Sequence, residues 1–192
     1  MRLKLNRIAV FCGSSFGNDE IYNKKASELG LEMARRGLSL VYGGGNKGLM
    51  GKIAHTVYEN GEEVIGVLPE ALNIPAVLKD SVHTKLIVVK DMHERKSTMY
   101  KLSDGFVAMP GGIGTLEEIA EIYTWRQLSF HSSNIALYNV DGFWNPLVEQ
   151  LRQMCQKGFM AKEVLDTLII EDNASILLDR LEEKAKELPR KV

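Results

Sequence analysis

The feature that most constrains the fold of this 192-residue chain is the alternation of short apolar runs with longer segments of helical periodicity. Apolar runs that are each followed by glycine or proline occupy residues 8–12, 38–42, 64–68 and 106–109. Segments with apolar residues at helical spacing follow at residues 22–36, 49–59, 92–102 and 115–128. Repeated strand–helix units predict a doubly wound, Rossmann-like α/β fold with a mostly parallel sheet flanked by helices.

The rest of the chain continues this alternation, with one exception. We expect strands at residues 86–89, 135–138 and 168–170, and helices at 146–156 and 175–188. Residues 70–85 have poor periodicity interrupted by Pro75, which predicts an irregular surface connection and a candidate lid. Because no linker or repeat divides the sequence, we expect a single α/β domain over residues 1–192.

Charge and hydropathy exclude several classes of protein. A formal net charge of -1 gives no global basic field, so we expect no nucleic-acid partner. No apolar stretch approaches the roughly 20 residues that span a bilayer, and residues 1–11 run into a strand pattern rather than a cleavable signal. Cys12 and Cys155 lack metal-ligand spacing and are expected to be buried thiols. We therefore expect a cytoplasmic protein with no membrane or metal association.

Three predicted strand ends carry glycine- or serine-rich turns. They contain Ser14, then Gly44 with Gly45, and finally Gly111 with Gly112. In a parallel sheet these turns lie at one edge, where glycines let the backbone approach a ligand and helix N-termini offer free N–H donors. This arrangement predicts a phosphate-binding site.

One of these turns also fits a different hypothesis. Gly43, Gly45 and Gly48 match the G-x-G-x-x-G dinucleotide fingerprint, which would indicate a nicotinamide-dependent oxidoreductase. That fingerprint belongs to the first strand–helix turn and needs an acid after the next strand, where Glu70 is only a loose candidate. No Lys-Ser or Lys-Thr follows Gly48, which excludes a P-loop.

Five motifs occur in order along most of the chain. They read FCGSS at residues 11–15, VYGGGNKGLMG at 41–51, MHERK at 92–96, PGGIGTLEE at 110–118 and YNVDGF at 138–143. Together they resemble the LOG family, cytokinin-activating nucleoside 5′-monophosphate phosphoribohydrolases that are often mislabelled lysine decarboxylases. The resemblance implies an enzyme that releases the base from a nucleoside 5′-monophosphate, acts as a homodimer and needs no cofactor.

The resemblance also implies site residues. The catalytic pair of the family falls on Arg95 and Glu118. Its substrate contacts fall on Lys96, Gly111, Gly112, Ile113, Gly114, Thr115, Leu116, Glu117 and Thr124. The family has an acidic substrate contact in the irregular segment, where an ungapped count places Val77, with Asp80 as an alternative if the loop is shifted. Base preference is accordingly left open.

The chemistry gives each of the catalytic candidates a role. Breaking an N-glycosidic bond builds oxocarbenium character on the ribose, which a carboxylate such as Glu118 stabilises. Arg95 is always charged, so it orients substrate or pairs with Glu118 rather than acting as a base. A simpler interpretation remains for each residue. Thr115 and Glu118 have capping-box spacing, and Arg95 with Lys96 fits a solvated helix face.

Two functions from different classes are therefore weighed. The first is hydrolysis of cytokinin riboside monophosphates or AMP to free base and ribose 5-phosphate. The alternative is a non-catalytic carrier of a nucleotide or of the molybdenum cofactor, which would need the phosphate-binding turns but not Glu118. Lysine decarboxylation is rejected because no lysine occupies a context typical of a pyridoxal phosphate Schiff base.

Overall fold

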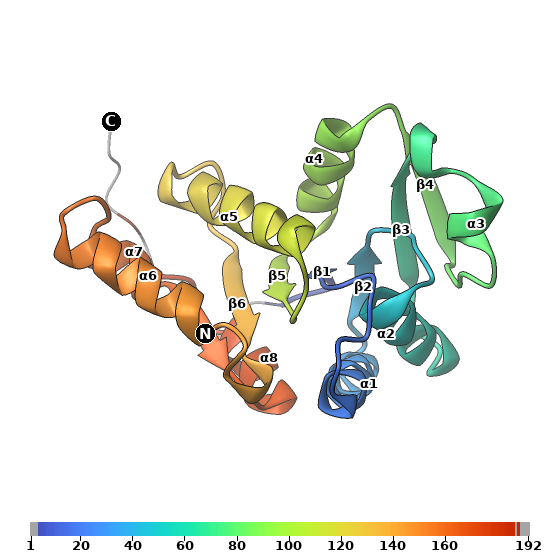
Figure 1. Cartoon of the computed structure of the whole chain (residues 1–192), viewed down its shortest axis with the longest axis horizontal. Coiled ribbons are helices and arrows are strands. Elements are labelled where there is room, and N and C mark those ends of the chain that lie inside the picture. The colour runs from blue at the N-terminus through green and yellow to red at the C-terminus, as the bar shows by residue number, and fades with distance from the viewer. Residues whose placement is uncertain (1–3, 187, 189–192) are drawn as a thin grey trace.

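The computed structural model describes residues 4–186 and 188, and these form one seven-stranded sheet between helices (Figure 1). Every neighbouring pair of strands is parallel, so the predicted doubly wound α/β class is confirmed. The strands are β1 (Arg7–Phe11), β2 (Ser39–Tyr42), β3 (Val64–Pro69), β4 (Lys85–Val89), β5 (Gly105–Ala108), β6 (Asn134–Tyr138) and β7 (Leu168–Glu171).

Helices cover both faces of the sheet. They are α1 (Glu20–Arg35), α2 (Gly48–Glu59), α3 (Pro75–Leu78), α4 (Met92–Leu102), α5 (Ile113–Gln127), α6 (Asn145–Gln156), α7 (Lys162–Leu165) and α8 (Ala174–Leu181), with short 3-10 helices η1 (Glu70–Leu72) and η2 (Val140–Gly142). In Figure 1, α4 and α5 lie on the opposite side of the sheet from α1 and α8.

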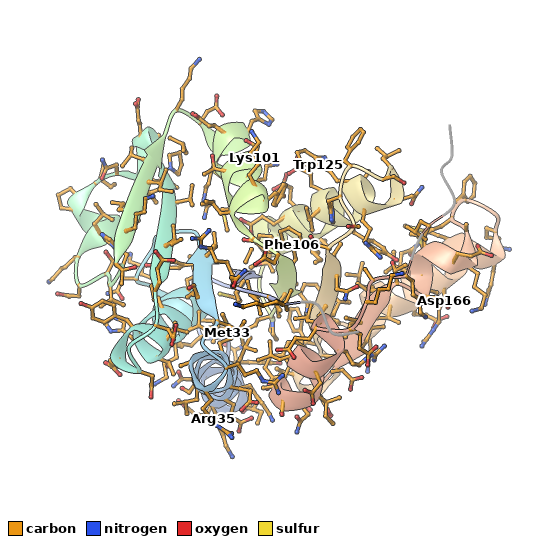
Figure 2. All side chains as sticks on the ribbon, turned by 180° about the vertical axis from the view of Figure 1, so that it is seen from behind. Met33, Arg35, Lys101, Phe106, Trp125 and Asp166 are labelled. Carbon is orange, nitrogen blue, oxygen red and sulfur yellow. The ribbon has the colours of Figure 1, made fainter. Side chains whose placement is uncertain are left out.

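Side chains alternate between two cores because successive strand residues point to opposite faces. In β1, Ile8 and Val10 pack with α1, α2 and α8, whereas Ala9 and Phe11 pack with α4, α5 and α6. Figure 2 shows Phe106 inside the molecule, where it is 1% exposed, and Arg35 projecting from the outer side of α1. The near-continuous apolar runs of the sequence are thus strands covered on both faces.

The order of the strands places a crevice at the centre of the sheet. It runs β4-β3-β2-β1-β5-β6-β7, so the chain moves outward from β1 to β4 and then returns to the other side of β1. Connections after β1 and β5 consequently leave in opposite directions and open a gap at the carboxyl ends of these strands. Ligands of doubly wound sheets bind at such a switch point.

Three segments differ from the expected elements. The last helix, predicted over residues 175–188, ends at Leu181. The irregular connection contains η1 and α3, and Pro75 opens α3 at the first helical position, where its missing N–H costs no hydrogen bond. Helix α7 was not predicted because it spans only 4 residues, too few to show a period.

The structure also bears on the expectations about the cysteines, membrane association and metal binding. Both cysteines are free thiols, and Cys12 is buried as predicted, but Cys155 is only partly buried. None of the helices in the described part of the chain is long and apolar enough to cross a membrane. Among the same residues, no group of three or more His, Cys, Asp or Glu side chains is arranged to hold a metal ion.

Candidate active site

The crevice between β1 and β5 holds a cleft of about 360 Å³. Its wall includes the catalytic pair suggested by the motifs, Arg95 and Glu118. The remaining lining residues are Cys12, Gly13, Ser14, Met50, Met92, Gly112, Ile113, Gly114, Thr115 and Glu117. The loops that follow β1 and β5 are tied together, because Gly13 N–H donates to the Pro110 carbonyl at 3.1 Å. Loops and helix starts of separate motifs therefore converge on one cavity.

The first turn of α4 sets the position of Arg95. Asp91 caps this helix, and its Oδ1 accepts the N–H groups of His93 and Glu94, each at 2.9 Å. Glu94 reaches back and accepts the Lys90 N–H at 2.7 Å. These contacts satisfy N–H groups that a helix start leaves unpaired, and they fix where α4 begins. Arg95 follows directly, on the turn that faces the sheet edge.

The guanidinium of Arg95 lies over the end of β2, where only glycine leaves it room. Its Nε donates to the Val67 carbonyl at 3.1 Å. A Cβ on Gly43 would lie 1.9 Å from Nη2, far inside contact distance. Nη1 is 3.8 Å from Oε1 of Glu118, too long for a hydrogen bond but close enough for strong charge interaction. The sequence VYGGG thus supplies the space in which Arg95 faces Glu118.

Glu118 is a buried carboxyl group with a raised pKa. Burial raises its pKa from the ordinary 4.5 to about 7, although the facing Arg95 charge works in the opposite direction. Only 12% of its side chain is exposed. A buried carboxyl group with a raised pKa in a cleft is typical of catalytic acids and bases.

Lys96 joins α4 to α5 beside this pair. Its Nζ forms ion pairs with Glu117 and Glu121, the latter at 3.1 Å, and the residue is 6% exposed. Burial alone would lower the pKa of Lys96, but its hydrogen bonds with the two carboxylates outweigh burial and raise the pKa. A Schiff-base lysine needs the opposite shift, toward a neutral amine. Lys96 therefore does not fit pyridoxal phosphate chemistry.

The start of α5 is free of side-chain caps and faces the cleft. Gly112 is the N-cap residue and makes no side-chain capping bond. A capping box would need Thr115 at the N-cap position. The capping-box interpretation of Thr115 and Glu118 is therefore wrong, because Thr115 is the third helical residue of α5. A Cβ on Gly111 would lie 2.2 Å from the Thr115 Oγ1, so glycine is required there for close packing. The unpaired N–H groups of the first turn are left to bind an anion.

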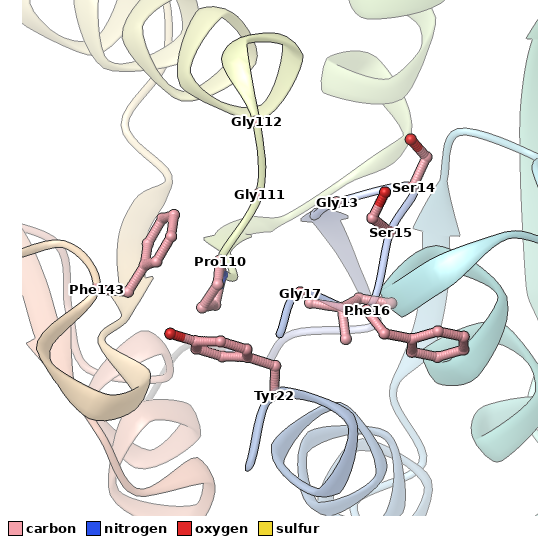
Figure 3. Close-up of a pocket in the computed structure, with 11 residues that line it drawn as sticks. Gly13, Ser14, Ser15, Phe16, Gly17, Tyr22, Pro110, Gly111, Gly112 and Phe143 are labelled. Atoms are coloured by element: carbon pink, nitrogen blue, oxygen red, sulfur yellow. The ribbon is translucent and has the colours of Figure 1, made fainter. Parts of the chain in front are cut away.

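A second cavity of about 270 Å³ adjoins the cleft (Figure 3). It shares Gly13, Ser14 and Gly112 with the cleft, and Tyr22 and Phe143 approach it from α1 and from the end of η2. Gly48 packs closely against the backbone of the Ser14 loop, because a Cβ on Gly48 would lie 2.3 Å from the Ser14 carbonyl carbon. The crevice therefore extends on both sides of the shared residues Gly13, Ser14 and Gly112.

Not all of the predicted site residues converge. Most of the α5 start and Arg95 line the cleft, and Gly111 lines the adjoining cavity. Lys96 stands behind Glu117. By contrast, Leu116 and Thr124 line an apolar groove between α5 and α6, and Thr124 donates to the Ala120 carbonyl. The substrate contacts assigned to all of the predicted site residues stay predictions.

The second glycine turn and the irregular segment form the side of the crevice nearest β3 and β4. Gly44 has a φ of +77°, and a Cβ there would meet Leu68 at 3.4 Å. Gly45 faces Met50 and Val77, whose Cγ1 would lie 3.9 Å from an added Cβ. Gly44 and Gly45 thus shape the wall behind the cleft. Val77 is near this wall, and Asp80 is an exposed residue with a φ of 59°.

Several residues of the cleft were not predicted from the sequence. Met50 and Met92 supply an apolar wall, and Cys12 contributes a thiol whose pKa burial and the Glu118 charge raise. Met50 lies inside the VYGGGNKGLMG motif and Met92 is the first residue of MHERK, so their place in these motifs could have identified both as site residues. Met92 lies against Arg95 itself, with its sulfur 3.8 Å from Nη1, so the cleft presents apolar surface beside the charged pair, which is suited to a flat base beside a polar ribose phosphate.

Comparisons with known proteins identify the family. Residues 50–181 match the family described as "Possible lysine decarboxylase". A cytokinin riboside 5′-monophosphate phosphoribohydrolase of Arabidopsis thaliana is 42% identical over 182 residues, which are 95% of this chain and 84% of the relative. The LOG enzyme of Oryza sativa subsp. japonica is 41% identical over 97% of this chain and 76% of its own length. The chain belongs to the LOG family.

Solved structures support the fold assignment of this LOG family member. The molybdenum cofactor carrier protein of Chlamydomonas reinhardtii aligns with a TM-score of 0.68 and 19% identity, over 92% of this chain and 96% of the carrier. The molybdenum cofactor binding protein of Rippkaea orientalis aligns with a TM-score of 0.66 and 22% identity, over 92% of this chain and 94% of that one. At these identities the likeness concerns the fold.

Proposed function

We propose that this LOG family member hydrolyses the N-glycosidic bond of nucleoside 5′-monophosphates, with Glu118 and Arg95 as its catalytic residues. The observation that carries the proposal is the Arg95–Glu118 pair, 3.8 Å apart in a cleft that also contains the uncapped start of α5. A carrier needs the anion site, but it has no use for a buried carboxyl group with a raised pKa beside it.

We propose a step for each of these groups. The 5′-phosphate binds the N–H groups of residues 112–115 at the start of α5, which positions the ribose near Glu118. As the bond between C1′ and the base nitrogen breaks, the Glu118 carboxylate stabilises the oxocarbenium character on C1′. Water then adds to C1′: its oxygen and one hydrogen become the C1′ hydroxyl, and its other proton goes to the departing base nitrogen, giving free base and ribose 5-phosphate. Arg95 orients the substrate and holds the Glu118 charge.

The pKa of Glu118 predicts the pH dependence of the reaction. The ionised carboxylate is the active form, and burial raises its pKa to about 7. We expect kcat/KM for base release to rise with pH through about 7 and to level off above it. A pH–rate series on AMP tests this. An acid limb centred near the ordinary value of 4.5 for a glutamate would contradict the role of Glu118.

The substrate class follows from the anion site at the start of α5. We propose AMP and cytokinin riboside monophosphates such as isopentenyladenosine monophosphate as substrates. Val77, rather than an acid, stands beside Gly45, so the side chain of residue 77 offers no hydrogen-bond acceptor to the base. Parallel incubations with adenosine and AMP test the phosphate requirement. We expect base release from AMP to exceed that from adenosine by at least about 100-fold in kcat/KM. Equal rates would refute the anion site.

We also propose that the protein forms a homodimer through the groove between α5 and α6. This groove of about 230 Å³ is mostly apolar and is lined on its α5 side by Leu116, Ala120, Tyr123 and Thr124. A second copy of the chain would remove this apolar surface from water. In light scattering we expect twice the chain mass of 21.5 kDa, and a monomer for Ala120→Arg. Glu149→Gln, on the exposed side of α6, serves as the control, and a monomeric wild type would contradict the proposal.

The compartment is also proposed. Both cysteines are free thiols, which suits a reducing environment such as the cytoplasm. A net charge of -1 agrees with a small-molecule substrate rather than a nucleic-acid partner.

A further inference from the structure

A second cluster of side chains joins the two helices that carry Arg95 and Glu118. Lys96 and Tyr100 stand one turn apart on α4, and both reach Glu121 on α5. Lys96 Nζ donates to Oε1 of Glu121 at 3.1 Å, and the Tyr100 hydroxyl donates to Oε2 at 2.7 Å. Both carboxylate oxygens of Glu121 are therefore engaged from the neighbouring helix.

The Tyr100 hydroxyl is held in place by packing of its ring. The residue is 8% exposed. Its ring makes edge contacts with Phe11, Phe106 and Trp125, at centroid distances of 6.2, 5.8 and 5.2 Å. Figure 2 shows Phe106 and Trp125 on the α4–α5 side of the molecule. Since rings in such contacts have little freedom, the hydroxyl is aimed at Glu121 before any substrate binds.

The two carboxylates that bind Lys96 differ in their surroundings. Glu117 lines the cleft and its side chain is 52% exposed, whereas the side chain of Glu121 is 27% exposed and lies outside the cleft lining. A substrate that enters the cleft meets Glu117 and leaves Glu121 in place. Glu121 is thus the constant partner of Lys96.

We propose that Glu121, fixed by Tyr100, is a positioning residue that holds Lys96 and α4 against α5 and so sets the separation of Arg95 from Glu118. The inference rests on the proposed function and goes beyond it, because Glu121 touches neither the cleft nor the substrate. Arg95 and Lys96 are adjacent on α4, and Glu118 and Glu121 are one turn apart on α5. A shift at the cluster is therefore transmitted directly to the catalytic pair.

Glu121 also contributes to the electrostatic field at Glu118. Burial is the main reason why the pKa of Glu118 is raised. Among the facing charges, Arg95 and Lys96 lower that pKa, whereas Glu117 and Glu121 raise it. The other titratable groups that face Glu118 are Cys12 and Tyr100, whose own pKa values are raised mainly by burial. Removal of the Glu121 charge should therefore lower the pKa of Glu118, and with it the acid limb of the pH–rate profile.

Two substitutions at Glu121 separate its charge from its contacts. Glu121→Gln loses the charge, but its amide can still accept from Lys96 and donate to the Tyr100 oxygen. Glu121→Ala loses both. We expect the acid limb to move to lower pH in both variants, because both lose the Glu121 charge that raises the pKa of Glu118. We expect kcat to fall at least about 10-fold further in Glu121→Ala than in Glu121→Gln, with a smaller change in KM.

Substitution of Tyr100 tests the same contact from the other helix. Tyr100→Phe keeps the packed ring and the Glu121 charge but removes the hydroxyl, which donates to Glu121 at 2.7 Å and also lies 3.4 Å from the Glu118 carbonyl oxygen. We expect kcat to fall by about fivefold, with no movement of the acid limb to lower pH. Glu149→Gln, an exposed carboxylate on α6, should change neither. Thermal melts of every variant measure how much protein is folded.

The outcomes separate this inference from the proposed function. The inference is overturned if kcat is unchanged in Glu121→Ala and Tyr100→Phe. It is also overturned if the loss of kcat only matches the unfolded fraction and the acid limb does not move, because the cluster would then be merely structural. If the wild type releases no base, the proposed function fails by itself. Carbon-13 NMR titration of the Glu118 carboxyl group in wild type and Tyr100→Phe still decides the inference, because it needs no turnover and both proteins keep the Glu121 charge. Arg95 lowers the pKa of Glu118, so a higher pKa in the variant means that Arg95 has moved away and supports the inference, and an equal pKa overturns it.

Discussion

Replacement of Glu118 by glutamine should reduce base release from AMP by about 10³-fold or more while nucleotide binding persists. Glutamine keeps the size of the side chain and occupies the same place in the cleft wall, but it cannot carry the negative charge that faces C1′ in the transition state. KM should change far less than kcat, because the phosphate contacts at the start of α5 are untouched. Steady-state kinetics on AMP, with product followed by chromatography, measures both.

The same substitution should leave the fold intact or stabilise it above neutral pH. Burial raises the pKa of Glu118 to about 7 in the folded protein, so its neutral form is the one the fold favours. The stability that this group contributes is present at low pH and is lost as pH rises through about 7. Glutamine stays neutral, so its gain in melting temperature over wild type should be larger at pH 8 than at pH 5. A destabilised variant at pH 8 would mean that the lost activity reports misfolding.

Replacement of Gly43 by alanine should lower kcat/KM by about 100-fold, although Gly43 need not touch the substrate. The added Cβ would lie 1.9 Å from Nη2 of Arg95, so the guanidinium must leave its place beside Glu118. Gly105→Ala is the matched control, because the nearest atom to its Cβ would be a Leu181 methyl carbon at 3.5 Å, an ordinary contact.

A double-mutant cycle tests whether Gly43 acts through Arg95. If it does, Gly43→Ala should cost little further activity in an Arg95→Ala background. Additive losses would show that Gly43 affects catalysis by another route, such as distortion of the loop after β2. Similar activity in Gly43→Ala and Gly105→Ala would contradict the assigned position of Arg95.

The fold was readable from the sequence because strands buried on both faces leave an unambiguous pattern. The runs before Gly13, Gly43 and Pro110 are apolar at nearly every position, and the helices between them are long enough to show a period. Short elements such as α7 lack that signal. The end of α8 at Leu181 was also missed, because the downstream residues continue the helical spacing without forming the helix.

The motifs named a candidate catalytic pair but not its geometry, and they did not name Cys12, Met50 or Met92, which also line the cleft. The motifs singled out Arg95 and Glu118, which are 23 positions apart in the sequence, yet only the fold brings them to 3.8 Å. The capping-box alternative failed because α5 begins at Ile113, two residues before Thr115, and helix starts are poorly defined by sequence. The contact of Tyr100 with Glu121 depends on how two helices pack, which no local spacing records.

The most direct test of the account is incubation of the purified protein with AMP and isopentenyladenosine monophosphate, with free base, ribose 5-phosphate and bound nucleotide measured in the same samples. The account predicts equal amounts of free base and ribose 5-phosphate that accumulate over many turnovers. Intact nucleotide retained on the protein, with neither product formed, would contradict hydrolysis and establish a carrier.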